Sequence, residues 1–217
     1  MRGEGKSQKR RGGGGDLSPH PSRLTPHASP LAQQSKVRII AGEWRGRLIH
    51  FPQAEGLRPT PDRVRETLFN WLGQTLDGKT CLDLFAGSGA LGFEALSRGA
   101  RRVVMVEQNP QVLKALQENA RKLGADRLDL VAGDGLKTLS REGKAFDVIF
   151  LDPPFHHGIL PLLLPLLPDR LAPDGLVYAE TEQALEPDEG WEVWRSGRAG
   201  NVFYCLLKRK TEGPHGA

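Results

Sequence analysis

The most informative stretch of the chain covers residues 146–155 and reads Phe146-Asp147-Val148-Ile149-Phe150-Leu151-Asp152-Pro153-Pro154-Phe155. Its apolar run from Val148 to Leu151 is typical of a buried strand. The two prolines end that strand, because proline cannot donate to a sheet ladder and holds φ at about −65°. A carboxylate and an aromatic ring are thereby presented at a strand's carboxyl end, where open α/β sheets bind ligands. Taken alone, Asp152 could equally be a turn residue and Phe155 a core residue.

Strand and helix patterns alternate from Thr80 onward, which predicts an α/β fold with a doubly wound, mostly parallel sheet. Strands are expected over Thr80–Phe85, Arg102–Glu107, Arg127–Val131, Phe146–Leu151 and Leu176–Glu180. Helices are expected over Ala90–Arg98, Pro110–Leu123, Leu136–Arg141 and Ile159–Leu171. Two more strands, near Trp191–Arg195 and Val202–Lys208, follow with no helix between them. We therefore expect these two to pair antiparallel at one edge of the sheet.

Residues 36–78 predict a smaller N-terminal unit ahead of the main domain, which we place at residues 79–210. Val37–Phe51 is typical of a β-hairpin with a glycine-containing turn. A helix should follow, with Thr60 as its N-cap and Pro61 at its first position, and it should end at Gly73 or Gly78.

The hairpin mixes arginines with the ring of Trp44, a combination that can hold phosphates and stack on a base. An edge hairpin kept soluble by its arginines explains the same residues equally well.

Composition places the chain among soluble globular proteins, with 217 residues, 38% of them hydrophobic and 26% charged. Its length suits one full-sized domain with a small appendage. The longest apolar segment is broken by prolines and falls short of the ~18 residues of a membrane span. A secretory signal is not recognisable either, so the cytoplasm is the expected location. Cys81 and Cys205 lie inside predicted strands, and no cluster of Cys and His has metal-ligand spacing, so we expect no metal site.

The basic charge of the chain is concentrated at its N-terminus. Residues 1–36 hold seven basic side chains against Glu4 and Asp16, a net charge of +5. Because the whole chain has a net charge of +4, the remaining residues together carry −1. Residues 1–35 are rich in Gly, Ser and Pro and have almost no apolar periodicity, which predicts a disordered basic tail. The tail could touch RNA through Lys9-Arg10-Arg11 or be a dispensable extension. Residues 211–217 are expected to be a flexible C-terminus.

A glycine-rich loop follows the first strand of the predicted sheet, with Gly87, Gly89 and Gly92 in the spacing G-x-G-x-x-G. Such a loop lets the backbone approach a ligand at a helix N-terminus, as in dinucleotide-binding enzymes. Glu107 ends the second strand and could accept both hydroxyls of a ribose, in NAD or in S-adenosylmethionine. Asp134, after the third strand, could meet an adenine amine. Each acid could also be a helix cap or a surface charge, so an NAD(P) oxidoreductase stays open at this point.

The fourth strand favours S-adenosylmethionine, because it delivers Asp152-Pro153-Pro154-Phe155 where a dehydrogenase needs a nicotinamide pocket. With Asp83, the glycine loop, Glu107 and Asp134 in order, the chain resembles class I S-adenosylmethionine-dependent methyltransferases that act on exocyclic amines of nucleic-acid bases. Residues 38–47 (RIIAGEWRGR) and 57–72 (LRPTPDRVRETLFNWL) are similar to the N-terminal signature of the RsmD family. That family comprises the bacterial 16S ribosomal RNA guanine-N2 methyltransferases. The resemblance covers about residues 36–209.

The resemblance implies a Rossmann-like, seven-stranded methyltransferase sheet with an N-terminal hairpin and helix. It implies that Asp152, Pro153 and Phe155 hold the target guanine of the small-subunit RNA. The implied cofactor-binding residues are Asp83, Phe85, Ala86, Gly87, Ser88, Gly89, Glu107, Gln108, Asp134, Gly135, Thr60 and Arg63. RNA contact is expected from Trp44, Arg45, Arg47 and Arg58. No metal is required, and a monomer is expected.

Three rival functions stay open, and the NAD(P) oxidoreductase is the least favoured of them. An adenine-N6 DNA methyltransferase would use the same Asp-Pro-Pro-Phe motif, but the chain has no spare length for a target-recognition domain. A noncatalytic ribosome-assembly factor could retain the fold, but the intact cofactor loop and Asp152 argue against it.

Overall fold

The computed structural model describes residues 34–54, 57–141, 143, 145–154 and 158–210. The first strand described starts at Gln34. Nearly all of the predicted tail, residues 1–35, lies outside the described residues. The predicted flexible C-terminus and Phe155 also lie outside them. No helix among the described residues is long and apolar enough to cross a membrane.

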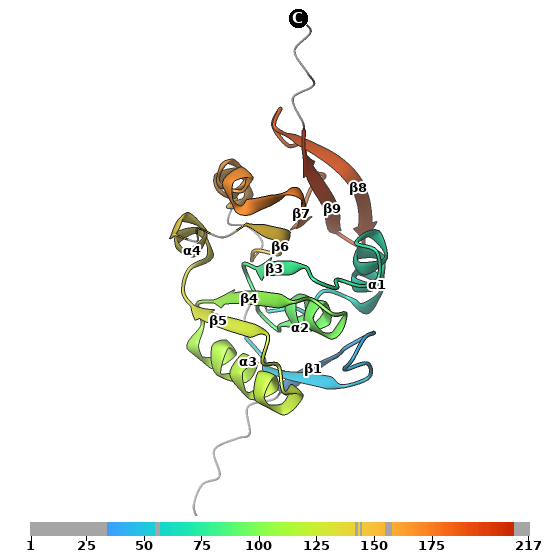
Figure 1. Cartoon of the computed structure of the whole chain (residues 1–217), viewed down its shortest axis with the longest axis vertical. Coiled ribbons are helices and arrows are strands. Elements are labelled where there is room, and N and C mark those ends of the chain that lie inside the picture. The colour runs from blue at the N-terminus through green and yellow to red at the C-terminus, as the bar shows by residue number, and fades with distance from the viewer. Residues whose placement is uncertain (1–33, 55–56, 142, 144, 155–157, 211–217) are drawn as a thin grey trace, which may run out of the picture. The chain divides into compact units, whose positions relative to one another are not determined.

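The core of the fold is a seven-stranded sheet with the order β5-β4-β3-β6-β7-β9-β8 (Figure 1). Its strands are β3 (Thr80–Asp83), β4 (Arg102–Glu107), β5 (Leu128–Ala132), β6 (Phe146–Leu151), β7 (Leu171–Thr181), β8 (Trp191–Ala199) and β9 (Val202–Arg209). Strands β3 to β7 run parallel, and β9 runs antiparallel to both of its neighbours, β7 and β8. The predicted fold class and its antiparallel edge are confirmed.

Alternate residues of the central strands pack on opposite faces of the sheet. Cys81 and Leu82 are adjacent in β3, yet each belongs to a different hydrophobic cluster. Helices α1 (Asp62–Trp71), α2 (Ala90–Ser97) and α3 (Pro110–Leu123) cover one face, and α4 (Gly135–Arg141) and α5 (Leu160–Leu163) contribute to the other (Figure 1). Burial on both faces explains why these strands read as continuous apolar runs.

The helix predicted over Ile159–Leu171 is wrong in its length. Only α5 is α-helical, and two short 3-10 turns follow at Leu164–Leu166 and Pro168–Arg170. Pro165 and Pro168 lack the N–H that a continuing α-helix needs, which accounts for the break. Strand β7 then starts at Leu171, earlier than predicted, because Leu171 pairs with Phe146 ahead of an irregularity in the register.

The predicted N-terminal hairpin consists of β1 (Gln34–Arg38) and β2 (Leu48–Pro52), which form a separate two-stranded antiparallel sheet. It docks on α3, where the side-chain amide of Asn119 bonds the backbone of His50 in both directions. Asn119 Nδ2 donates to His50 O at 2.7 Å, and His50 N donates to Asn119 Oδ1 at 3.2 Å. The hairpin and α1 share one hydrophobic cluster with the sheet.

Helix α1 begins one residue later than predicted. Pro61 is its N-cap with a ψ of 147°, and the helix starts at Asp62. The reason is that Thr60 directly precedes Pro61, and a residue before proline is disfavoured from helical backbone. The Thr60 hydroxyl is not used as a cap. The helix ends at Trp71, just before Gly73 with its φ of +99°, as one of the two predicted stops.

Candidate active site

Five acidic residues gather at one edge of the sheet, where the parallel strands end; we call this the carboxyl edge. Asp83, Glu107, Asp134 and Asp152 end or follow β3, β4, β5 and β6. Glu180 lies at the end of β7 and was not predicted as a site residue. Because these five strands are parallel neighbours, the structure brings the predicted acids to one side of the domain.

The glycine-rich loop between β3 and α2 has the backbone that its sequence predicts. Gly87 has a φ of +49°, and Gly89, the N-cap of α2, has a φ of +79°. A side chain at Gly92 would collide with Met105 on β4. Its absence lets Gly92 N approach and donate to Asp83 Oδ2 at 3.1 Å. The third glycine of the motif therefore serves the packing of α2 on the sheet.

Asp83 is buried, with 2% of its surface exposed. Burial raises the pKa of its carboxyl to about 7, and the charge of Glu107 adds to the rise, while the hydrogen bond from Gly92 opposes it. A cation placed against Asp83 would stabilise the charged form of its carboxyl.

Glu107 ties the glycine loop to the next loop of the carboxyl edge. Its Oε2 accepts from Gly87 N at 3.0 Å, and its Oε1 accepts from Asn109 N at 2.7 Å. Each carboxylate oxygen has a second lone pair, so the side chain can still accept from a ribose hydroxyl. Gln108 is exposed beside it.

Asp134 caps helix α4, since its Oδ1 accepts from Lys137 N at 2.9 Å. The neighbouring Gly135 lies tight against the end of β3, where an added Cβ would stand 2.9 Å from Leu84 O and from the ring of Phe85. Ser88, on the opposite loop, accepts from Ala90 N at 3.3 Å. The capping role that the sequence left open for Asp134 is present, and it leaves the other oxygen available for a ligand.

Asp152 sits directly after β6 and is half-buried, next to the buried Pro153. Thr60 Oγ1 donates to Asp152 Oδ2 at 3.5 Å, so Thr60 contacts the predicted catalytic carboxylate. Glu180 lies close to both Asp152 and Thr60, and the Tyr178 hydroxyl donates to its Oε1 at 2.8 Å. The sequence offered one signal for Glu180: it ends the fifth strand as Asp152 ends the fourth.

Asp152 and Glu180 both have a raised pKa. Burial, followed by the charges of Glu180 and Asp83, raises the pKa of Asp152 well above its usual range. Burial also raises the pKa of Glu180, and hydrogen bonds from Tyr178 and Thr60 oppose that rise. The cluster is therefore a poor place for an anion and a good one for a cation or a proton.

A buried ion network holds Thr60 in place. Arg65 Nε donates to Thr60 O at 3.2 Å, and Arg65 Nη1 pairs with Glu94 Oε2 at 3.2 Å. Arg98 Nε pairs with the other oxygen of Glu94 at 2.8 Å. The predicted cofactor residue Arg63 instead lies on the exposed side of α1, so the arginine that points into the protein is Arg65.

The predicted RNA contacts divide into exposed and buried residues. Arg45, Arg47 and Arg58 are exposed, and Arg47 Nη2 donates to Lys122 O at 3.0 Å. The prediction that Trp44 stacks on a base does not fit the structure, because its side chain is only 5% exposed and packs in the core. Trp44 N donates to Ser97 Oγ at 2.9 Å, which fixes the turn of the hairpin on the end of α2.

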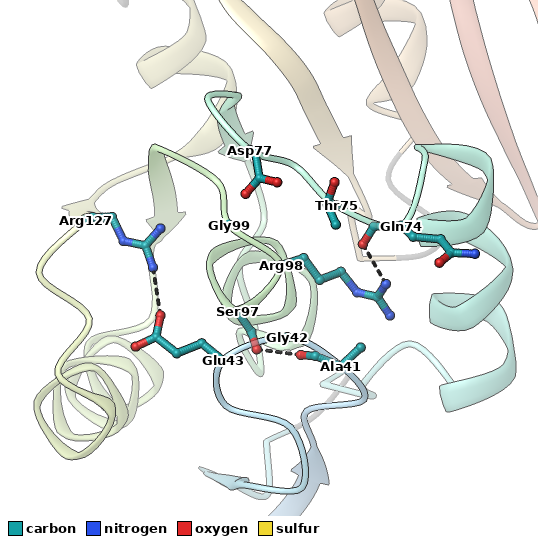
Figure 2. Close-up of a pocket in the computed structure, with 10 residues that line it drawn as sticks. All are labelled: Ala41, Gly42, Glu43, Gln74, Thr75, Asp77, Ser97, Arg98, Gly99 and Arg127. Atoms are coloured by element: carbon teal, nitrogen blue, oxygen red, sulfur yellow. Dashed lines mark hydrogen bonds and ion pairs between the residues drawn. The ribbon is translucent and has the colours of Figure 1, made fainter.

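A separate hollow of about 520 Å³ lies near the end of α2, away from the carboxyl edge. Figure 2 shows its walls: Arg127 points at Glu43 from one side, and Arg98 reaches the backbone of Gln74 on the other. These cations are already matched by protein groups, so we assign the hollow no role.

Comparison with known proteins identifies the family. The family described as Conserved hypothetical protein 95 matches residues 37–208. Ribosomal RNA small subunit methyltransferase D of Escherichia coli K12 is 42% identical over 183 residues, covering 82% of this chain and 92% of that protein. The chain belongs to this family. The resemblance seen in its sequence is thereby confirmed.

Other family members agree with this assignment. The protein of the same name from Haemophilus influenzae is also 42% identical, covering 81% of this chain and 95% of its own length. The solved structure of yhhF from Escherichia coli is 41% identical, with a TM-score of 0.74 over 82% of this chain and 100% of that one. The family's fold therefore extends over nearly all of the residues that the structure describes.

Proposed function

We propose that this chain transfers a methyl group from S-adenosylmethionine to the exocyclic N2 amine of a guanine in small-subunit ribosomal RNA. The names of its relatives support methyl transfer as the reaction and small-subunit ribosomal RNA as the substrate. The observation that carries the residue assignment is the position of Asp152, which directly follows β6 beside the glycine loop that follows β3. Methyl donor and acceptor groups can meet at that point of the carboxyl edge.

The electrostatics of the site support S-adenosylmethionine over NAD(P). The acids Asp83, Asp152 and Glu180 would oppose the pyrophosphate of a dinucleotide. A sulfonium and an ammonium group would instead relieve their mutual repulsion. We assign the methionine part of the cofactor to Asp83 and the loop Phe85–Gly89, with Thr60 closing that side.

The ribose and adenine of S-adenosylmethionine would bind at the neighbouring loops. Glu107, with Gln108 beside it, would accept from the ribose hydroxyls, and Asp134 and Gly135 would face the adenine. The close approach of Gly135 to Phe85 supports this division, because it brings the two loops to one continuous edge.

The chain's own residues would activate the amine and remove its proton. S-adenosylmethionine supplies, when bound, a methyl group on a sulfonium that leaves as a neutral thioether. Asp152 and the Pro153 carbonyl would accept hydrogen bonds from the guanine N2 amine, which turns its lone pair toward the methyl group. Asp152 would take the proton that the amine loses when it is methylated. Its raised pKa suits that task.

The remaining assignments follow from the same reaction. Phe155 would stack on the extruded base, although it lies outside the described residues. Arg45, Arg47 and Arg58 are exposed and would contact RNA. The proposal includes a monomer in the cytoplasm that acts on naked RNA or on the small subunit.

Substitution of Asp152 tests the proposal. Asp152→Ala should abolish transfer of radiolabelled methyl to small-subunit RNA while leaving S-adenosylmethionine affinity within a few-fold by calorimetry. Naked RNA, undermethylated small subunits and duplex DNA are offered side by side, and the labelled base is identified by nuclease digestion. Label in N2-methylguanine supports the proposal. Label only in DNA adenine, or full activity of the Asp152→Ala variant, overturns it.

A further inference from the structure

Asp152 and Glu180 lie side by side at the carboxyl edge. The register of β6 and β7 pairs Phe150 with Tyr178, and each acid follows the aromatic residue of its own chain segment by two positions. Because side chains alternate between the two faces of a sheet, both acids lie on the face of these rings, which belong to the cluster that α1 covers. The charge of Glu180 acts on Asp152, as this placement requires. Neighbouring strands thus deliver a pair of carboxyls to the proposed site.

The hydroxyl of Thr60, just ahead of α1, interacts with both carboxyls. Thr60 Oγ1 donates to Asp152 Oδ2 at 3.5 Å, and Thr60 also hydrogen-bonds Glu180. A hydroxyl has one hydrogen to donate and two lone pairs that accept. It can therefore serve two carboxyls at once only when one of them is protonated and donates to it. The contacts of Thr60 fit a carboxyl pair that holds one proton.

Within the residues that the structure describes, no ion pair joins Asp152 or Glu180 to a basic side chain, whereas the buried Glu94 pairs with two arginines. Two neighbouring carboxyls without a cation resist ionising together, so such a pair retains a proton. Burial raises the pKa of Glu180, and a group of this kind costs folding free energy once the pH exceeds the ordinary carboxyl range. The stability of the fold therefore does not explain why β7 carries a carboxyl here.

We propose that Glu180 is a positioning residue for methyl transfer, which shares one proton with Asp152 through the Thr60 hydroxyl and so holds the Asp152 carboxylate toward the guanine amine. The inference rests on the proposed function and adds a residue to its site. Before the reaction the proton is on Glu180 and Asp152 is ionised. When the amine is methylated, the proton that it loses moves to Asp152 and then to water, while Glu180 keeps its own.

The titratable and charged groups around the pair are Asp83 on β3, Tyr178 on β7, Tyr204 on β9 and Arg65 on α1. Burial raises the pKa of Tyr178, so its hydroxyl remains a donor to Glu180 throughout the range in which carboxyls titrate. Asp83, with its pKa of about 7, titrates as well. The shared proton must therefore be followed at Asp152 itself.

Two substitutions of Glu180 separate positioning from a purely structural role. In Glu180→Gln the amide oxygen can accept from Tyr178 and the amide nitrogen can donate to Thr60, as the protonated carboxyl would. Its kcat should stay within a few-fold of wild type. Glu180→Met has a similar length and no such groups, and it should lower kcat about tenfold or more while KM for RNA and S-adenosylmethionine affinity change little. The control Asp174→Asn removes an exposed carboxylate from the other end of β7 and should behave as wild type.

Urea unfolding of each variant shows whether a lost activity is a lost fold. Glu180→Met leaves the buried Tyr178 hydroxyl without its acceptor, which itself destabilises the protein. The double variant Glu180→Met/Tyr178→Phe removes both partners and decides the matter if the single variant unfolds. If Glu180 only anchors the end of β7, the kcat of every variant should follow its stability, and a stable Glu180→Met or double variant should be fully active.

Carbon-13 NMR of the Asp152 carboxyl gives a reading that does not depend on activity. In the wild type its signal should follow the titration of both carboxyls, and one of these steps should disappear in Glu180→Gln. An Asp152 titration that is the same in both proteins, wild-type kcat in a folded Glu180→Met variant, or an equal loss of kcat in Glu180→Gln would overturn the proposal. A wild-type protein that methylates no RNA would instead contradict the proposed function, so the two failures are distinct.

Discussion

The buried carboxylate of Glu94 links the N-terminal hairpin, α1 and α2, and its removal should cost more than any surface ion pair. Glu94 is fully buried and accepts from Ile40 N at 2.7 Å and from Ala41 N at 3.0 Å. It also pairs with Arg65 and Arg98, whose side chains are 0% and 7% exposed. Four donors therefore converge on one carboxylate.

Glu94→Gln keeps the shape of the side chain and removes its charge. Breaking a buried ion pair by removing one partner costs about 3–5 kcal/mol, and each hydrogen bond to a charged acceptor contributes about 1.5–3 kcal/mol. The ion-pair and hydrogen-bond contributions cannot simply be added, because both belong to the carboxylate of Glu94. Arg65 also keeps its pairing with Asp62 at 2.6 Å. We therefore expect a loss of about 3 kcal/mol in the free energy of unfolding, a large part of the usual 5–15 kcal/mol.

Urea unfolding followed by tryptophan fluorescence measures the loss, provided that the slope against urea stays constant. The matched control is Glu43→Gln. The side chain of Glu43 is 62% exposed and pairs with Arg127, so its loss should be below about 1 kcal/mol. A loss below about 1 kcal/mol for Glu94→Gln as well would refute the reasoning.

Three further predictions concern the hairpin turn and the cofactor residues. Gly42→Ala should destabilise the protein by more than Gly46→Ala in the same urea assay. Both have φ near +80°, but only at Gly42 would the new Cβ collide with Ser97 O; equal losses would contradict this. S-adenosylmethionine affinity, measured by calorimetry, should rise up to tenfold per unit between pH 6 and 7, as Asp83 with its pKa of about 7 loses its proton; a flat profile would disprove the assignment. Glu107→Gln should weaken that affinity about tenfold, and unchanged affinity would exclude the ribose role.

The sequence alone predicts the central strands well, because burial on both faces leaves a continuous apolar run with sharp ends. Strands β4 and β6 have the predicted bounds, and β3 ends two residues early, at Asp83. Pairing that depends on a distant partner is harder to predict. The first residues of β7 join the sheet only through Phe146. The strand propensity of these residues does not indicate that pairing.

The same distinction applies to the site. The gathering of Asp83, Glu107, Asp134 and Asp152 at the carboxyl edge could be predicted because each ends or follows a recognisable strand. The environment of a side chain is set by the whole fold, so Trp44 could not be told from a surface aromatic and Arg63 could not be told from Arg65. Glu180 was missed for a related reason, since a carboxylate at a strand end becomes informative only once its neighbours are known.

The position of β9 between β7 and β8 has a consequence for how the molecule assembles. Strand β9 is the last strand described, yet it lies inside the sheet, and among the described strands β8 pairs with β9 alone. Until β9 is in place, β7 presents an open edge beside Glu180, and the aromatic cover that Tyr204 gives to Tyr178 is missing. The end of the domain that carries the proposed site can therefore reach its final form only after the chain has been made as far as Arg209. A protein cut short before Val202 should aggregate through that edge.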